Sequence, residues 1–213
     1  LFLSQWPFAP RLLIEQRNKL LFLKGGVVMS RTKSYLEGMR ILAVDDEEDV
    51  LDTIEEDLEF SHVDKASDYH TAKEKIEKGK YDLAILDIMG VDGLNLLQET
   101  VSKGIPTVML TAHAMNSDTL MTSIQRGAIS FLPKEKLAEL EELLANILGA
   151  HHSGKPTWKI LFEELGEHFD EKFGPDWQEK HSDFWSKFNQ TYSVGKGIQT
   201  RLMHDQNVLS KGV

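Results

Sequence analysis

Five polar residues of the sequence directly follow short apolar runs, and their types suit one kind of chemistry. Two aspartates follow the first run, and an aspartate, a threonine and a lysine follow three later runs. These residues are Asp45, Asp46, Asp87, Thr111 and Lys134. Three carboxylates, one hydroxyl and one ammonium can bind and transfer a phosphoryl group if the fold brings them to one place.

Each of these residue types has a separate role in such a reaction. Neighbouring carboxylates raise one another's pKa unless a cation lies among them, and with oxygen donors alone Mg²⁺ fits best. An aspartate that faces the ion can attack a phosphoryl group and form an acyl phosphate. The lysine and the hydroxyl then offset the charge on the phosphoryl oxygens. Taken singly, however, an aspartate after a strand is often a helix N-cap, and a lone lysine or threonine there is usually a surface residue.

The apolar runs and the segments between them predict an alternating α/β fold. The predicted strands cover 40–44, 63–66, 81–86, 106–110 and 128–132, and apolar residues at helical spacing predict helices near 50–58, 72–76, 94–101, 115–126 and 137–148. Five strands alternating with five helices imply right-handed crossovers and a doubly wound parallel sheet covered on both faces. Such sheets bind ligands beyond the carboxyl ends of their strands, where the candidate residues fall.

Charge and aromatic content divide the chain into three segments. Residues 1–38 contain six Lys or Arg and two Asp or Glu, residues 39–150 contain ten and 23, and residues 151–213 contain eight and nine. The last segment also holds nine of the 18 aromatic residues, against four in the middle one. We therefore expect an N-terminal extension, a domain over 39–150, and an aromatic-rich helical extension that ends in a flexible tail.

The composition argues against several classes of protein. The chain carries 24 Lys and Arg against 34 Asp and Glu, and a net charge of −10 is unusual for a protein that grips nucleic acid by its phosphates. The absence of cysteine excludes a disulfide scaffold, a Cys-ligated zinc site and thiol catalysis, and it suits a cytoplasmic location. No apolar run approaches the roughly 20 residues that a membrane span needs.

The start of the chain has two interpretations. It lacks both the basic beginning and the small-residue cleavage site of a secretory signal. Codons for Lys24-Gly25-Gly26 would be purine-rich and resemble a bacterial ribosome-binding site shortly before Met29. One hypothesis is therefore that translation starts near Met29 and that residues 1–28 are leader read-through. The alternative is a loosely amphipathic N-terminal helix.

The stretches that carry the candidate residues resemble the receiver domain of bacterial two-component response regulators. They are Ile-Leu-Ala-Val-Asp45-Asp46-Glu, Leu-Ala-Ile-Leu-Asp87, Val-Met-Leu-Thr111-Ala112 and Gly-Ala-Ile-Ser-Phe131-Leu-Pro-Lys134. The resemblance covers residues 39–150 and implies a flavodoxin-like (βα)5 fold with strand order 2-1-3-4-5. It also implies a phosphoacceptor regulatory protein, not an enzyme, whose partner is a sensor histidine kinase or a phosphotransfer protein.

The same resemblance implies a role for each motif residue. Asp87 would be the phosphoacceptor, and Thr111 and Lys134 would contact the phosphoryl oxygens. Phe131 would be the aromatic residue that swings inward when Thr111 moves. The implied Mg²⁺ ligands are Asp45, Asp46, Asp87 and the backbone carbonyl of Met89.

Two features depart from the family pattern. The loop after Asp87 is two residues shorter than is common and lacks a proline, and Pro133 precedes Lys134 where family members have a proline after it. Neither change removes a chemical group, but the short loop puts the phosphorylation rate and the kinase-docking surface in doubt. Met89 and His113 flank the approach of an attacking water, and we expect them to tune the phosphate lifetime; the alternative for His113 is a surface residue without this role.

Two alternative functions remain open at this point. One is a phosphorelay shuttle without an output of its own. The other is a phosphohydrolase of haloacid-dehalogenase type, which also uses an aspartate nucleophile and Mg²⁺. That family needs a second aspartate two residues after the nucleophile, and here the position holds Met89.

The third segment predicts a helical hairpin with two aromatic faces. Aromatic and leucine side chains over 158–173, and aromatic side chains over 177–192, recur at the spacing of one helix face. Between them, Gly174 suits a left-handed C-cap, Asp176 suits an N-cap, and Glu179 completes a capping box. The hairpin lacks a basic recognition helix, so we expect no binding to DNA.

Two helices cannot bury both aromatic faces alone, so the hairpin should pack on the receiver, on a second copy or on another protein. We expect residues 155–192 to form a surface for a homodimer or a protein partner; the alternative is a structural cap. The expected partner-surface residues are Trp158, Phe162, Phe169, Phe173, Trp177, Phe184, Trp185 and Phe188. His168, His181 and His204 are poorly spaced for a metal and are expected to be solvated.

Overall fold

The computed structural model describes residues 33–112 and 116–193 of the chain. The hypotheses about residues 1–28, about His113 and His204, and about a flexible tail lie outside the described residues. No helix within these two ranges combines the length and the apolar character needed to cross a membrane.

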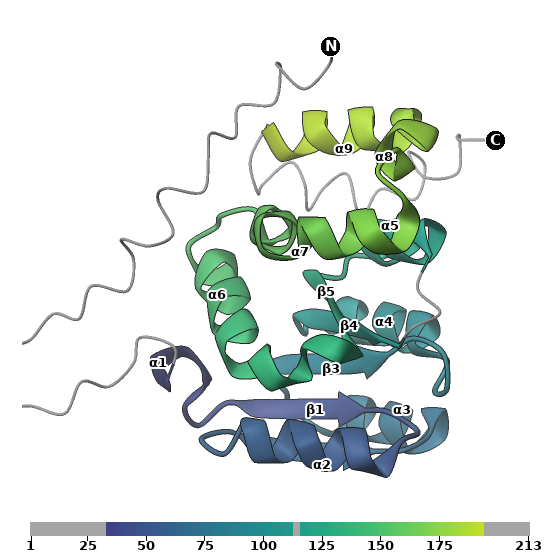
Figure 1. The fold of residues 1–213 in the computed structure, drawn as a ribbon. Helices are drawn as coiled ribbons and strands as arrows, with labels where there is room; N and C mark the ends of the chain where they lie inside the picture. The colour runs from purple at the N-terminus through teal and green to yellow at the C-terminus, as the bar shows by residue number, and fades with distance from the viewer. Residues whose placement is uncertain (1–32, 113–115, 194–213) are drawn as a thin grey trace, which may run out of the picture. The chain divides into compact units, whose positions relative to one another are not determined.

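A parallel sheet of five strands forms the centre of the described fold (Figure 1). Its strands are β1 (Arg40–Val44), β2 (His62–Ala66), β3 (Leu83–Asp87), β4 (Thr107–Thr111) and β5 (Ser130–Pro133). They lie in the order β2-β1-β3-β4-β5 and every pair is parallel, which confirms the predicted doubly wound fold and its strand order. Strands β3, β4 and β5 are buried along their whole length, as expected for strands that helices cover on both faces.

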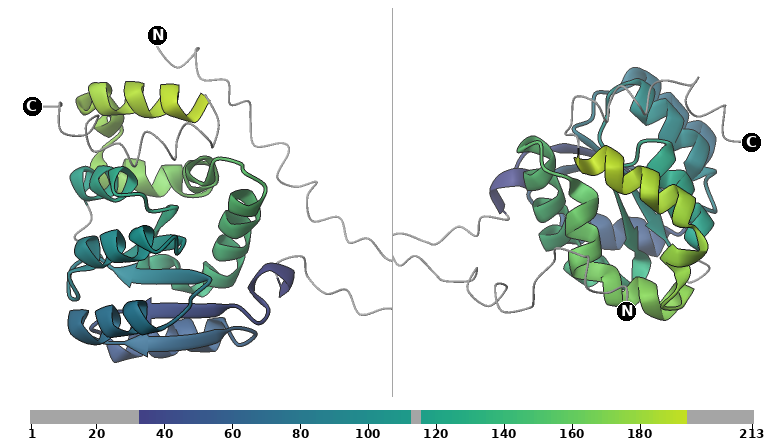
Figure 2. Two further views of the ribbon diagram at one scale, coloured as in Figure 1. Left: turned by 180° about the vertical axis from the view of Figure 1, so that it is seen from behind. Right: turned by 90° about the horizontal axis from the view of Figure 1, so that it is seen from above.

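Helices cover both faces of this sheet. They are α2 (Glu48–Asp57), α3 (Tyr69–Lys78), α4 (Gly93–Ser102), α5 (Ser117–Gln125) and α6 (Leu140–His152), and the 3-10 helix η3 (Lys134–Glu139) leads from β5 into α6. Helices α2 and α6 pack together on one face, and α3, α4 and α5 lie on the other (Figures 1 and 2). A short helix, α1 (Lys33–Leu36), packs against α6 with Leu36 buried.

Side-chain caps fix the starts of two crossover helices. Asp68 precedes α3 and accepts a hydrogen bond of 2.9 Å from the backbone N–H of Thr71. Asn116 precedes α5, and its Oδ1 accepts from the backbone N–H of Thr119 at 2.8 Å and from the hydroxyl of Thr119 at 2.9 Å. Each cap supplies a partner to an N–H group that has none inside its own helix.

The substitution Asn116→Ala is expected to lower the free energy of unfolding by about 1 kcal/mol, because the first turn of α5 loses its side-chain acceptor. Urea denaturation measures this loss. Asn116→Ser keeps a side-chain oxygen at the same position and is the control, for which we expect a smaller loss. Equal losses in the two variants would contradict the capping role.

The C-terminal helices are confirmed, and the second arm of the hairpin is broken into two pieces. The helices are α7 (Thr157–Phe173), α8 (Trp177–Lys180) and α9 (Ser182–Ser193). Helix α7 packs against α6 and β5, and α8 and α9 follow above it in the view of Figure 1. The break falls at His181, whose Nε2 lies 3.1 Å from the hydroxyl of Ser117 in α5.

The break at His181 brings two tryptophans into contact. The ring centroids of Trp177 and Trp185 are 5.1 Å apart at an interplanar angle of 90°. Eight residues along a straight helix span about 12 Å, so the bend lets both rings reach one aromatic cluster. Gly174 ends α7 with a φ of 87°, which favours glycine, although its ψ of 150° lies outside the left-handed helical region. Asp176 forms an ion pair with Lys180 instead of a capping hydrogen bond.

Candidate functional site

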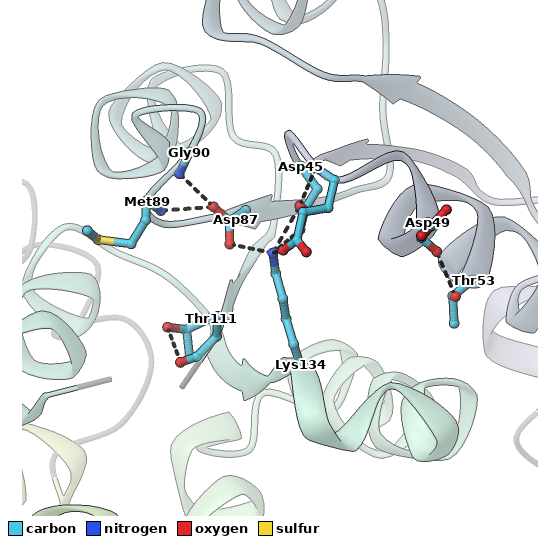
Figure 3. A network of polar contacts seen from close by, with 10 residues as sticks. Asp45, Asp49, Thr53, Asp87, Met89, Gly90, Thr111 and Lys134 are labelled. Atoms are coloured by element: carbon cyan, nitrogen blue, oxygen red, sulfur yellow. Dashed lines mark hydrogen bonds and ion pairs between the residues drawn. The ribbon is translucent and has the colours of Figure 1, made fainter. Parts of the chain in front are cut away.

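The parallel strands carry four of the predicted residues to one edge of the sheet (Figure 3). Asp45 follows β1, Asp87 ends β3, Thr111 ends β4 and Lys134 follows β5. Asp45 is fully buried and Asp87 is 3% exposed. Because β1 and β3 are neighbours in the sheet, the two carboxylates lie close together in a place with little water, and positive charge is needed there.

Lys134 supplies positive charge to this edge. Its Nζ lies 2.8 Å from Oδ2 of Asp45, 3.1 Å from Oδ1 of Asp87 and 2.8 Å from Oε1 of Glu47. Burial alone would lower the pKa of Lys134, but the hydrogen bonds to Asp45 and Glu47 and the charge of Asp87 outweigh burial and raise it. The lysine is therefore protonated and joins the ends of β1, β3 and β5.

The site holds more negative charge than Lys134 balances. Burial raises the pKa of Asp45 and the charge of Asp87 adds to this increase, whereas hydrogen bonds from Lys134 and from the backbone N–H of Glu47 oppose it. The pKa of Glu47 is lowered, because its carboxylate accepts a hydrogen bond from Lys134. One ammonium thus faces three carboxylates, an arrangement that favours a further cation.

The backbone after β3 fixes the orientation of the Asp87 carboxylate. The N–H groups of Met89 and Gly90 both donate to Oδ2 of Asp87, each at 2.9 Å, while Oδ1 faces Lys134 (Figure 3). Hydrogen bonds from two backbone amides hold one oxygen in place.

Two glycines allow the shortened loop to close. A Cβ at Gly93 would overlap the carbonyl oxygen of Asp87, and a Cβ at Gly90 would overlap the carboxylate of Asp46. Asp92 between them has a positive φ of 54° and leads directly into α4. Asp46, which is exposed, therefore lies against the loop and not against Lys134.

Thr111 ends β4 at the same edge of the sheet without a hydrogen bond to Asp87, and Phe131 lies in β5, three residues before Lys134. Thr111 is 4% exposed, and its hydroxyl donates to the carbonyl oxygen of Ala112 at 3.4 Å. Phe131 is fully buried, and its ring meets Phe169 of α7 edge to face with the centroids 6.5 Å apart. The switch roles of both residues stay predictions.

The candidate Mg²⁺ ligands have the chemistry that a hard divalent cation requires, because all are oxygen donors. Oδ2 of Asp45 is buried and accepts no hydrogen bond, although Lys134 is near, so it keeps a lone pair available. The described residues include no three acidic or histidine side chains already arranged around a metal position. The residues that would hold the ion are Asp45, Asp46 and Asp87; the role of the Met89 carbonyl stays a prediction.

The expected partner-surface residues pack into the chain itself. Four are buried and four are half-buried, and their rings contact one another across α7, α8 and α9. The buried ones are Trp158, Phe169, Trp177 and Trp185, and the half-buried ones are Phe162, Phe173, Phe184 and Phe188. In this arrangement the cluster serves packing between the helices and β5, and a surface for a partner through these residues stays a prediction.

Sequence reasoning missed Glu47 and the two backbone amides that hold Asp87. Glu47 stands next to Asp46 in the first motif, so a third acid after β1 was a visible signal. Its contact with Lys134 joins residues that are 87 positions apart, which no local pattern reports.

Comparison with known proteins identifies a family for the part of the chain that contains this site. The family model described as the response regulator receiver domain matches residues 41–147. The response regulator MprA of Mycobacterium leprae is 36% identical over 124 residues, covering 55% of this chain and 53% of its own. The regulatory protein VanR of Enterococcus faecium is 38% identical over 101 residues, covering 45% of this chain and 43% of its own. A two-component response regulator from Clostridium difficile has a solved structure with 25% identity and a TM-score of 0.48, covering 52% of this chain and 95% of that one.

The chain therefore belongs to the response regulator receiver domain family of two-component systems. It spans about half the length of the curated relatives that it matches. The match ends within α6, and α7, α8 and α9 lie outside it.

Proposed function

We propose that this protein is a response regulator in which residues 39–150 receive a phosphoryl group on Asp87 and residues 151–213 transmit the change. The donor is a phosphohistidine of a sensor kinase or of a phosphotransfer protein. The observation that carries the proposal is the environment of Asp87. Its Oδ2 accepts two backbone hydrogen bonds, and its Oδ1 lies 3.1 Å from Lys134.

The proposed reaction is an in-line displacement at phosphorus. Oδ1 of Asp87 forms the new O–P bond as the P–N bond of the phosphohistidine breaks, and the departing imidazole nitrogen takes a proton from water. Lys134 offsets negative charge that develops on the phosphoryl oxygens. A divalent cation held by Asp45, Asp46 and Asp87 supplies further neutralisation when bound. The N–H groups of Met89 and Gly90 keep the carboxylate from rotating.

Two contacts support an output through the C-terminal helices. Phe131, the expected switch aromatic, meets Phe169 of α7, and Nε1 of Trp158 donates to the carbonyl oxygen of Ala128 just before β5 at 3.1 Å. A change at Thr111 that moves Phe131 must therefore disturb the packing of α7 against β5. Packed interfaces of this kind adopt discrete arrangements, and phosphorylation can shift the population between them.

A third contact links α7 to the site through the 3-10 helix η3. Lys172 of α7 lies 3.3 Å from Oε1 of Glu135, which is the residue after Lys134. Because Lys134 must adjust to a phosphoryl group on Asp87, its neighbour in η3 moves with it. Helix α7 thus contacts both β5 and η3, the two elements on either side of Lys134.

Hydrogen exchange in the presence of a phosphoryl mimic tests this proposal. With Mg²⁺ and beryllofluoride, we expect amides of α7, α8 and α9 to exchange severalfold faster than with Mg²⁺ alone. Labelling of a parallel sample without beryllofluoride by a small phosphodonor, stable in acid and released by hydroxylamine, reports the acyl phosphate. Labelling without any change in exchange would contradict the output proposal and favour a phosphorelay shuttle.

A further inference from the structure

The ammonium of Lys134 is shared among three carboxylates. An ammonium group carries three N–H donors, and Lys134 has ion-pair partners on three separate segments, at 2.8, 2.8 and 3.1 Å. These partners are Asp45 after β1, Glu47 before α2 and Asp87 at the end of β3. Two of these donors are hydrogen-bonded, to Oδ1 of Asp45 at 2.9 Å and to Oε1 of Glu47 at 2.8 Å, and the ammonium also forms an ion pair with Asp87.

The three partners differ sharply in their exposure to water. The side chains of Asp45 and Asp87 are 0% and 4% exposed, whereas that of Glu47 is 61% exposed. A buried carboxylate that loses its lysine is left with an uncompensated charge, which is strongly unfavourable. An exposed carboxylate replaces the lysine with water at little cost. Of the three partners, Glu47 is the one that can leave.

We propose that Glu47 is a positioning residue that holds Lys134 in the unphosphorylated protein and releases it when a phosphoryl group arrives on Asp87. This inference rests on the proposed function of Asp87 as phosphoacceptor. Glu47 acts through Lys134 and does not touch the reacting atoms. Its backbone N–H donates to Oδ1 of Asp45 at 3.0 Å, so the main chain of Glu47 stays in place while its side chain swings into water.

The release of Lys134 by Glu47 affects the affinity of the protein for an acyl-phosphate mimic. While Glu47 is bound to Lys134 it competes with the phosphoryl oxygens for one N–H donor, and its charge repels an anionic ligand. Removing that charge at position 47 therefore strengthens binding of an acyl-phosphate mimic. The effect is the size of one exposed ion pair, which corresponds to about two- to fivefold in affinity.

Glu48 provides a matched control for this test. It is exposed, it begins α2 one residue after Glu47, and it is not among the ion-pair partners of Lys134. Glu48→Gln removes the same unit of charge beside the site without removing the contact. The affinity for beryllofluoride is measured at saturating Mg²⁺ for the full-length wild type, Glu47→Gln and Glu48→Gln. Glu47→Gln is expected to bind about two- to fivefold tighter than Glu48→Gln, and equal affinities of the two variants would overturn the inference.

A carboxyl resonance gives a second readout that a merely structural role of Glu47 would not change. In ¹³C spectra of the wild type, beryllofluoride should move the Cδ signal of Glu47 towards that of a solvated glutamate and leave the Cδ signal of Glu48 unchanged. If the Glu47 signal does not move in protein that binds the mimic, the proposed release of Lys134 by Glu47 is wrong, while the proposed function of Asp87 stands. If the wild type neither binds the mimic nor accepts label, the proposed function is wrong, and so is the proposed release of Lys134 by Glu47, which rests on it.

Discussion

Asp87→Asn is expected to abolish labelling of the protein by a small phosphodonor such as acetyl phosphate. The amide oxygen is a far weaker nucleophile than the carboxylate, so the O–P bond does not form. Asn has nearly the volume of Asp, and its Oδ1 can accept the hydrogen bonds that the N–H groups of Met89 and Gly90 now donate to the carboxylate. The fold should therefore persist, and circular dichroism and urea denaturation check that it does.

Asp92→Asn in the same loop is the matched control for this experiment. Asp92 is exposed, and its positive φ of 54° is one that Asn also adopts readily. The control removes the same charge five positions after Asp87 and should keep full labelling. Equal stoichiometry of label in Asp87→Asn and in the wild type would place the acceptor elsewhere.

The fold was predictable because its strands are short, apolar and bounded by polar residues. The run before Asp87 predicts a strand over 81–86, and the observed β3 begins two residues later. The difference has a physical reason. Tyr81 donates its hydroxyl to Asp64 at 2.9 Å, and Asp82 accepts the backbone N–H of Arg40 at 2.8 Å. The side chains of Tyr81 and Asp82 thus form contacts at the end of the sheet, and the local sequence does not reveal these contacts.

The chemistry of the site was predictable to the extent that it depends on strand ends. Asp45, Asp87 and Lys134 each stand next to an apolar run, and parallel strands necessarily bring such positions together. The contact of Glu47 with Lys134 depends instead on where a loop before α2 lies relative to η3. The double hydrogen bond to Asp87 depends on the path of a shortened loop, for which the family pattern offers no guide.

The C-terminal helices show where periodicity stops being informative. The aromatic pattern continues through His181 without interruption, so it predicts one helix from 177 to 192. The break falls at His181, whose Nε2 lies 3.1 Å from the hydroxyl of Ser117 in α5, and local periodicity does not report this contact. Only the packed chain reveals that Trp177 and Trp185 belong to one cluster.

Phe169→Ala is expected to lower the free energy of unfolding by about 3–5 kcal/mol, the usual cost of deleting a fully buried aromatic ring. Phe169 is 0% exposed, and its ring contacts those of Phe131 in β5, Phe173 in α7 and Trp177 in α8. Its removal opens a cavity between the receiver and the C-terminal helices. Both the receiver and the C-terminal helices should therefore lose stability.

Urea denaturation followed by tryptophan fluorescence and by far-ultraviolet circular dichroism measures this loss. If α7 to α9 and the receiver unfold as one unit, both signals should shift together to lower urea. Phe188→Ala is the control, because Phe188 is only half-buried and its ring contacts those of Phe184 and Trp185 in its own helix, α9. We expect the control to cost clearly less. A fluorescence transition that moves while the receiver signal stays in place would contradict a shared core, and it would also remove the route by which Phe131 could act on α7.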